Sequence, residues 1–192
     1  ALDLHRHFDN AVKSGIEFLT MEVSSQALKY DRTMGVTFDV GCFLNIGIDH
    51  ISGVEHPDFE DYLKSKMILF SQCKTACINL ESDYAKMALE AADGKAQRVL
   101  TFGLRPEADI YGYDVEPGRK GISFRVKCDS FDEEFRIGMT GLFNVQNALA
   151  AIAVSYALNI PLEYVKAGLK KARVSGRMEI YTSRRGNLAV IV

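Results

Sequence analysis

The chain has 192 residues, of which 47% are hydrophobic and 25% are charged. This composition is typical of a folded globular protein and too apolar for a disordered one. Its 23 Lys and Arg residues nearly balance its 25 Asp and Glu residues, so the formal net charge is −2. The balance argues against duplex nucleic acid and anionic membranes as partners, because both favour a basic surface. No stretch reaches the roughly 20 apolar residues that span a bilayer.

The start of the chain and its cysteines indicate a cytoplasmic origin. The opening residues, ALDLHRH, lack the layout of a signal peptide and begin without Met, so we expect a piece cut from a longer protein. Two of the four cysteines form a single C-x3-C pair, which is a poor zinc pattern without a second pair. We expect structural thiols in a reducing compartment at all four positions, which are Cys42, Cys73, Cys77 and Cys128.

Predicted strands and helices alternate over the first half of the chain. Helical patterns are expected at residues 8–14 (a helix end before Gly15), 59–71 and 84–92. Apolar runs predict buried strands at residues 17–24, 36–46, 75–80 and 98–102. This alternation is typical of parallel crossover units. We therefore expect an α/β fold with a mostly parallel sheet and helices on both faces.

The pattern changes after Arg105. Short strands without helices between them are predicted at residues 110–115, 121–127 and 134–139, which indicates a small antiparallel patch. Helices are then expected at residues 142–158 and 161–172, followed by strands at 179–182 and 188–192.

Several polar residues lie where the pattern predicts apolar or strand-end positions. Glu22 ends an apolar strand, where a carboxylate is costly unless it is paired, hydrogen-bonded or bound to a metal, although it could equally cap the next helix. Asp49 and His50 follow the second strand. Ligands of open parallel sheets bind beyond the carboxyl ends of strands, so this pair favours a metal or phosphate site over an ordinary histidine.

Lys66 lies on the apolar stripe of the helix predicted at residues 59–71, whereas Lys64 lies on its polar face. An inward lysine must extend its amine to solvent, pair with an acid, or lose its charge. In the last case the neutral amine can do chemistry.

Asn144 and Asn147 share a face near the positive start of the helix predicted at residues 142–158. That position suits polar ligand contacts or helix capping. Arg177 lies at an apparent turn into a strand, which by itself indicates little. The sequence contains no G-x-x-x-x-G-K-[ST], G-x-G-x-x-G or G-x-S-x-G motif, so its own motifs provide no cradle for a triphosphate.

Five segments, in order and spread over nearly the whole chain, resemble the Mur ligases of bacterial peptidoglycan synthesis. The match is to the branch that adds the third amino acid to UDP-MurNAc-L-Ala-D-Glu. The segments are MEVSSQAL at residues 21–28 with Arg32, LNIGIDH at 44–50, YLKSK at 62–66, GLFNVQNAL at 141–149 and GRME at 176–179.

The resemblance implies an ATP-dependent carbon–nitrogen ligase that uses Mg2+. In the family, ATP phosphorylates the terminal carboxylate of the peptide precursor, and the amine of the incoming amino acid attacks the acyl phosphate. By the same resemblance, Glu22, His50 and a carbamylated Lys66 hold the magnesium ions. The carbamate converts the amine of Lys66 into a carboxylate.

The remaining implied roles concern substrate and nucleotide. Ser24 and Arg32 match residues that contact the UDP-MurNAc-dipeptide. Asn144 and Asn147 match positions that contact adenine, and Arg177 matches an arginine near the nucleotide.

The resemblance also implies that residues 1–174 form the central ATP-binding domain without its P-loop segment. Residues 175–192 then begin the C-terminal ligase domain. We expect the missing N- and C-terminal domains to be partners of this piece, and the piece alone to be inactive. The sequence departs from the family at Gln26 and Tyr30, and a slightly longer stretch before Lys66 contains His56, which we predict to lie at the surface.

Three alternatives stay open at this point. The chain could belong to a related ligase, such as a folylpolyglutamate or cyanophycin synthetase, or to a noncatalytic binding domain with the same fold. The third alternative is a zinc hydrolase, which is disfavoured because the histidines of this chain lack the spacing of zinc ligands. These histidines are His5, His7, His50 and His56. Whether lysine or diaminopimelate is the third amino acid is not indicated.

Overall fold

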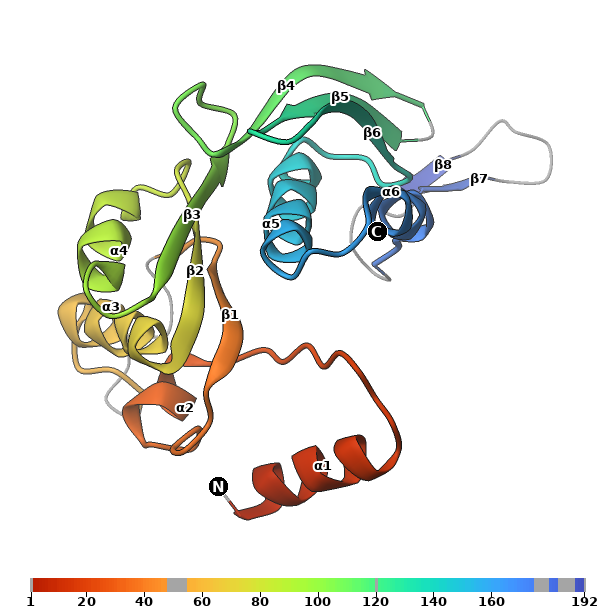
Figure 1. The fold of residues 1–192 in the computed structure, drawn as a ribbon. Coiled ribbons are helices and arrows are strands. Elements are labelled where there is room, and N and C mark those ends of the chain that lie inside the picture. The colour runs from red at the N-terminus through yellow and green to blue at the C-terminus, as the bar shows by residue number, and fades with distance from the viewer. Residues whose placement is uncertain (1, 48–54, 120, 175–179, 183–188, 192) are drawn as a thin grey trace.

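The computed structural model describes residues 2–47, 55–119, 121–174, 180–182 and 189–191. Its main sheet has six strands in the order β1-β2-β3-β4-β5-β6 (Figure 1). β1 to β4 are parallel, and β5 and β6 extend the sheet in antiparallel fashion. The bounds are Phe38–Phe43, Cys73–Asn79, Arg98–Gly103, Ile110–Gly118, Gly121–Lys127 and Asp132–Ile137 for β1 to β6. The predicted fold class is confirmed.

Helices cover both faces of the parallel strands. Figure 1 shows α3 (Phe59–Met67) and α4 (Ala85–Ala92) on one side of β1–β3 and α5 (Phe143–Ala157) on the other. Along β2, Ala76 and Ile78 pack toward α3 and α4, whereas Cys77 belongs to the hydrophobic cluster that includes α5. Successive side chains of a strand point to opposite faces, so β2 is buried on both and has a continuous apolar run.

Shorter elements complete the chain. α6 (Leu162–Lys171) packs against β6, and β7 (Ile180–Thr182) pairs with β8 (Ala189–Ile191) in a separate antiparallel ribbon. The helix predicted at residues 59–71 is α3 followed by a 3-10 helix, η1 (Ile68–Gln72). No helix among the described residues is both long and apolar enough to cross a membrane.

The strand predicted at residues 17–24 is wrong. After α1 (Leu2–Lys13), residues 16–24 have no regular secondary structure, and Phe18 and Leu19 are 59% and 51% exposed. A groove of about 660 Å3 lies between this segment and β1. In the described part of the chain no strand fills that space, so the segment has no neighbour to pair with.

Two positions on α5 give a test of this core. Leu149 is fully buried on α5 and packs close to Gly112 of β4, whereas Leu142, at the start of the same helix, is 61% exposed. We expect Leu149→Ala to lower the free energy of unfolding by about 2–5 kcal/mol, because it leaves a cavity in a close-packed interior. Leu142→Ala should change it by less than about 0.5 kcal/mol. Urea denaturation followed by circular dichroism checks both, and equal effects of the two changes would contradict this packing.

Candidate functional site

The carboxyl ends of β1, β2 and β3 lie next to one another at one end of the sheet, and side-chain hydrogen bonds join them. Asn79, the last residue of β2, is buried and donates its amide to the carbonyl of Leu44, just after β1, at 2.9 Å. Its amide oxygen accepts the backbone N–H of Glu81 at 3.0 Å. Glu81 in turn accepts the N–H of Leu104, just after β3, at 3.1 Å. The three strand ends are therefore fixed relative to one another.

Sequence reasoning did not identify these residues as part of the hydrogen-bonded cluster at the carboxyl ends of the strands. Ser82 also belongs to it, because its hydroxyl donates to the side-chain oxygen of Asn45 at 3.2 Å. The signal was available. Asn79, Glu81 and Ser82 come at the end of a predicted strand, which is the same position that singled out Glu22.

Glu22 and Lys66 interact through their opposite charges, without a direct ion pair between them. Glu22 is an exposed residue of the irregular segment, and Lys66 is half-buried on α3. Burial lowers the pKa of the Lys66 amine, and the negative charge of Glu22 opposes this effect by raising the pKa. The two side chains are thus close enough to interact electrostatically. The Lys66 amine also lies 5.2 Å from the centroid of the Tyr62 ring, a cation–π distance.

Other predicted site residues lie on or next to two helices, α2 and α5. Ser24 caps α2 (Ser25–Lys29), since its hydroxyl accepts the N–H of Ala27 at 3.1 Å, and Arg32 is exposed just after that helix. Asn144 is buried on the first turn of α5, whereas Asn147 is exposed one turn later.

The side chain of Asn144 is used within the protein. Its amide donates to the carbonyl of Thr140 at 2.7 Å, and its oxygen accepts from the Asn147 amide at 3.3 Å. Asn147 is therefore the more accessible of the two for a ligand.

His50, with Asp49, and Arg177 lie outside the described residues. Among the residues that are described, no group of three or more His, Cys, Asp or Glu side chains could hold a metal ion. Glu22 and Lys66 are therefore the two predicted metal-site residues whose positions the structure gives.

The prediction that His56 lies at the surface is wrong. It is 1% exposed and has a partner on each ring nitrogen, Ser25 from α2 and Asp61 from α3. A histidine in an irregular stretch shows no apolar periodicity, so its burial depends on α2 packing against α3.

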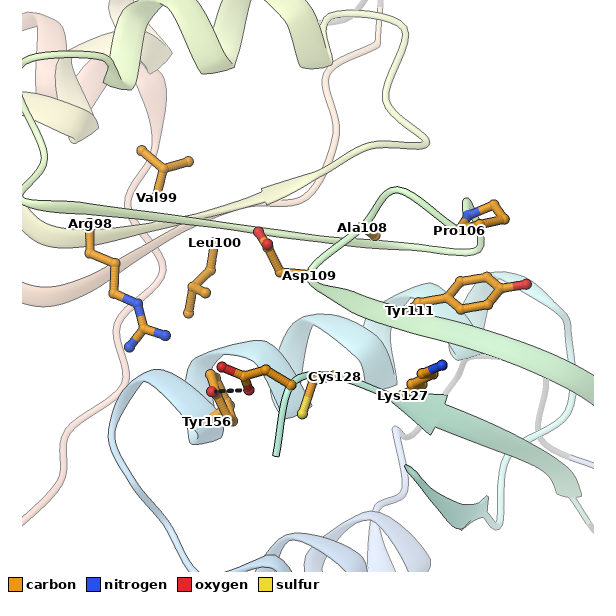
Figure 2. A pocket seen from close by; sticks show the side chains of 11 residues that line it. Arg98, Val99, Leu100, Pro106, Ala108, Asp109, Tyr111, Lys127, Cys128 and Tyr156 are labelled. Carbon is orange, nitrogen blue, oxygen red and sulfur yellow. Dashed lines mark hydrogen bonds between the residues drawn. The ribbon is translucent and has the colours of Figure 1, made fainter. Parts of the chain in front are cut away.

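A cavity of about 590 Å3 opens at the other end of the sheet (Figure 2). It is lined by Arg98 at the start of β3 and by Tyr156 near the end of α5, whose hydroxyl donates to Asp129 at 2.6 Å. Tyr156 is twelve residues beyond Asn144, which is about 18 Å along a helix. None of the predicted site residues lines this cavity.

Three of the four cysteines behave as structural thiols. Burial raises the pKa of Cys42 to about 12 and also raises the pKa values of Cys73 and Cys77, so these three side chains are protonated at neutral pH. A thiol must ionise to act as a nucleophile or a metal ligand, and these three are therefore poor candidates for either role.

Comparisons with known proteins decide the family. A family model described as the Mur ligase middle domain matches residues 1–155. The chain belongs to the Mur ligase family. It is 36% identical to UDP-N-acetylmuramyl-tripeptide synthetase of Bifidobacterium longum over the whole chain, and 38% identical to UDP-N-acetylmuramoyl-L-alanyl-D-glutamate--L-lysine ligase of Streptococcus thermophilus over 97% of it. These findings confirm the resemblance seen in the sequence.

A solved structure agrees with the fold. That of a UDP-N-acetylmuramoyl-L-alanyl-D-glutamate--2,6-diaminopimelate ligase superposes with a TM-score of 0.85 and 25% identity over 95% of the chain. The chain spans only 37–38% of the length of these three Mur ligases.

The contrast between Lys64 and Lys66 gives a test of the site. The pKa of exposed Lys64 is raised, mainly by its hydrogen bond to Glu60, whereas burial lowers that of Lys66. In the folded protein Lys66 should therefore release its proton at a lower pH than Lys64. Reductive methylation with 13C-formaldehyde and NMR titration measures both values, with Lys66→Arg and Lys64→Arg assigning the resonances. An equal or higher pKa at Lys66 would contradict the inward placement.

Proposed function

We propose that this Mur ligase chain is the central part of an ATP-dependent ligase that adds the third amino acid to UDP-MurNAc-L-Ala-D-Glu during bacterial peptidoglycan synthesis. Two of its relatives are named as ligases that join L-lysine or 2,6-diaminopimelate to this UDP-linked dipeptide. Residues 1–174 would contribute to the central ATP-binding domain, and residues 175–192 would begin the C-terminal domain. The enzyme would act in the cytoplasm, where ATP and nucleotide-linked precursors are available.

The observation that carries the proposal is the half-buried Lys66, whose amine feels the negative charge of Glu22. A lowered pKa increases the fraction of neutral amine at a given pH. A neutral amine can attack CO2, forming an N–C bond and losing one proton, so that a carbamate replaces the cation. The site then has two negatively charged groups, the Glu22 carboxylate and the Lys66 carbamate, in place of one carboxylate and one ammonium.

These groups fit the cofactor that the family implies. Mg2+ prefers hard oxygen ligands such as carboxylates, and Glu22 together with carbamylated Lys66 would supply them, with His50 as the third ligand that we predict. When bound, Mg2+ neutralises charge on the phosphates. The protein's own contribution would be to present Glu22 and Lys66 to the same ion.

The substrate and the nucleotide would be held by exposed polar side chains. Arg32 has the planar guanidinium that binds carboxylates and phosphates in a bidentate manner, and Ser24 is exposed at the start of α2. Asn147 would contact adenine, and Asn144 would orient the Asn147 side chain by accepting a hydrogen bond from its amide. Arg177 would lie near the nucleotide.

The alternatives are less well supported. A noncatalytic domain has no need for a desolvated lysine next to a carboxylate. The relatives at 36% and 38% identity are named as muramyl-tripeptide and L-lysine ligases, and not as folylpolyglutamate or cyanophycin synthetases.

The test uses the full-length enzyme. We expect Lys66→Ala to lower kcat for ligation by at least about 100-fold, because charge stabilisation at the transferring phosphoryl group is lost. Lys64→Ala, two residues earlier on the exposed face, should stay within about twofold. The assay follows ADP release that depends on both the UDP-MurNAc-dipeptide and lysine or diaminopimelate.

Two outcomes would contradict the proposal. One is an Lys66→Ala enzyme that remains as active as the wild type. The other is a wild-type enzyme that releases no ADP with either amino acid. The 192-residue chain assayed alone should be inactive, because it contains no P-loop motif.

A further inference from the structure

Four side chains form a connected network between α2 and α3. The Ser25 hydroxyl lies 2.8 Å from Nε2 of His56, and Nδ1 of His56 lies 2.6 Å from an Asp61 carboxylate oxygen. The same oxygen accepts a hydrogen bond from Lys29 at 2.6 Å. Ser25 and His56 are buried, and Asp61 is partly exposed. Hydrogen bonds from Lys29 and then His56 lower the pKa of Asp61, so its carboxylate is ionised at neutral pH.

The order of Ser25, His56 and Asp61 is that of a hydrolase triad, but its surroundings do not suit hydrolysis. The Ser25 hydroxyl is enclosed, and neither the groove beside β1 nor the cavity at the start of β3 is lined by any of the three residues. A nucleophile that substrate cannot reach has no catalytic use. The network must therefore act through what it holds in place.

The network holds the two sides of the proposed metal site. Glu22 lies at the end of the irregular segment, and Ser25, three residues later, is the first residue of α2. This helix has only five residues and is too short to be stable by itself. Its placement depends on contacts with α3, and the bonds through His56 and Asp61 are part of those contacts.

The other side of the network reaches Lys66 through an aromatic ring. The His56 ring lies 5.0 Å from the Tyr62 ring, centroid to centroid. The Lys66 amine lies 5.2 Å from the same Tyr62 centroid. Tyr62 is buried, so its ring is a fixed surface that both the imidazole and the amine approach. A shift of His56 would therefore reach Lys66 through this ring, and the segment that carries Glu22 through Ser25.

We propose that His56, linked to Ser25 and Asp61, is a positioning residue that sets the distance between Glu22 and Lys66. The inference rests on the proposed ligase function. It goes further by assigning a role to a hydrogen-bonded triad that would touch neither substrate nor metal.

The test compares variants of the full-length ligase at saturating substrates while the Mg2+ concentration is varied. Ser25→Ala and His56→Asn should each raise the half-saturating Mg2+ concentration, and lower kcat, by about 10- to 100-fold, the usual effect of removing a group that orients metal ligands. The KM for the incoming amino acid should stay within about twofold. The double variant should be no more impaired in kcat and Mg2+ affinity than the more severely impaired single variant, because both changes break the same link.

Two controls separate positioning from stability. Val165→Ala creates a cavity beneath α6, on the opposite face of the sheet, and should lower Tm without altering the Mg2+ dependence. Lys64→Ala, at an exposed ion pair on α3 itself, should change neither. If His56→Asn does not fold, Ser25→Ala, which removes a single oxygen atom, decides the matter.

The inference is overturned if Ser25→Ala lowers Tm as Val165→Ala does but retains the wild-type Mg2+ requirement and kcat. That result would leave the ligase function standing, because the function is judged by wild-type turnover and by Lys66→Ala. A wild-type enzyme without ligase activity would instead remove the basis for both.

Discussion

Parallel pairing of β1, β2 and β3 is the constraint on which the rest of the structure depends. Parallel strands require crossover connections, and here α3 and α4 make these connections on one face while α5 covers the other. All three strands consequently finish at the same end of the sheet, where Asn79 and Glu81 hold the strand ends together. The helix that returns the chain from β1 to β2 also carries Lys66, in its last turn, so the topology itself places this lysine on the face of the sheet that α3 and α4 cover.

Sequence patterns were informative wherever one element determines its own structure. Lys66 could be singled out because the period of a helix places it among apolar residues, and its partial burial needs only α3 and the sheet beneath it. Asn144 was ambiguous between capping and ligand binding for the same reason: the sequence shows its place on the helix, while the Thr140 carbonyl that occupies its amide becomes visible only in three dimensions.

The failures concern residues whose environment is supplied by distant parts of the chain. The apolar run at residues 17–24 resembles a strand, but a strand exists only when a neighbour accepts its hydrogen bonds. His56 looked like a surface residue because its stretch has no periodicity, yet α2, 31 residues earlier in the chain at Ser25, covers it. Local patterns contain no information about either neighbour.

The two edges of the main sheet differ in a way that matters for handling the chain. At one edge, β6 is shielded by α6 and by the ion pair between Lys166 and Glu133. At the other, no described strand pairs with the outer side of β1, and the adjoining groove is lined by apolar side chains such as Phe18, Leu19 and Val40. Unpaired backbone groups beside apolar surface are a template for strand addition. Concentrated solutions of the isolated chain should therefore self-associate through β1.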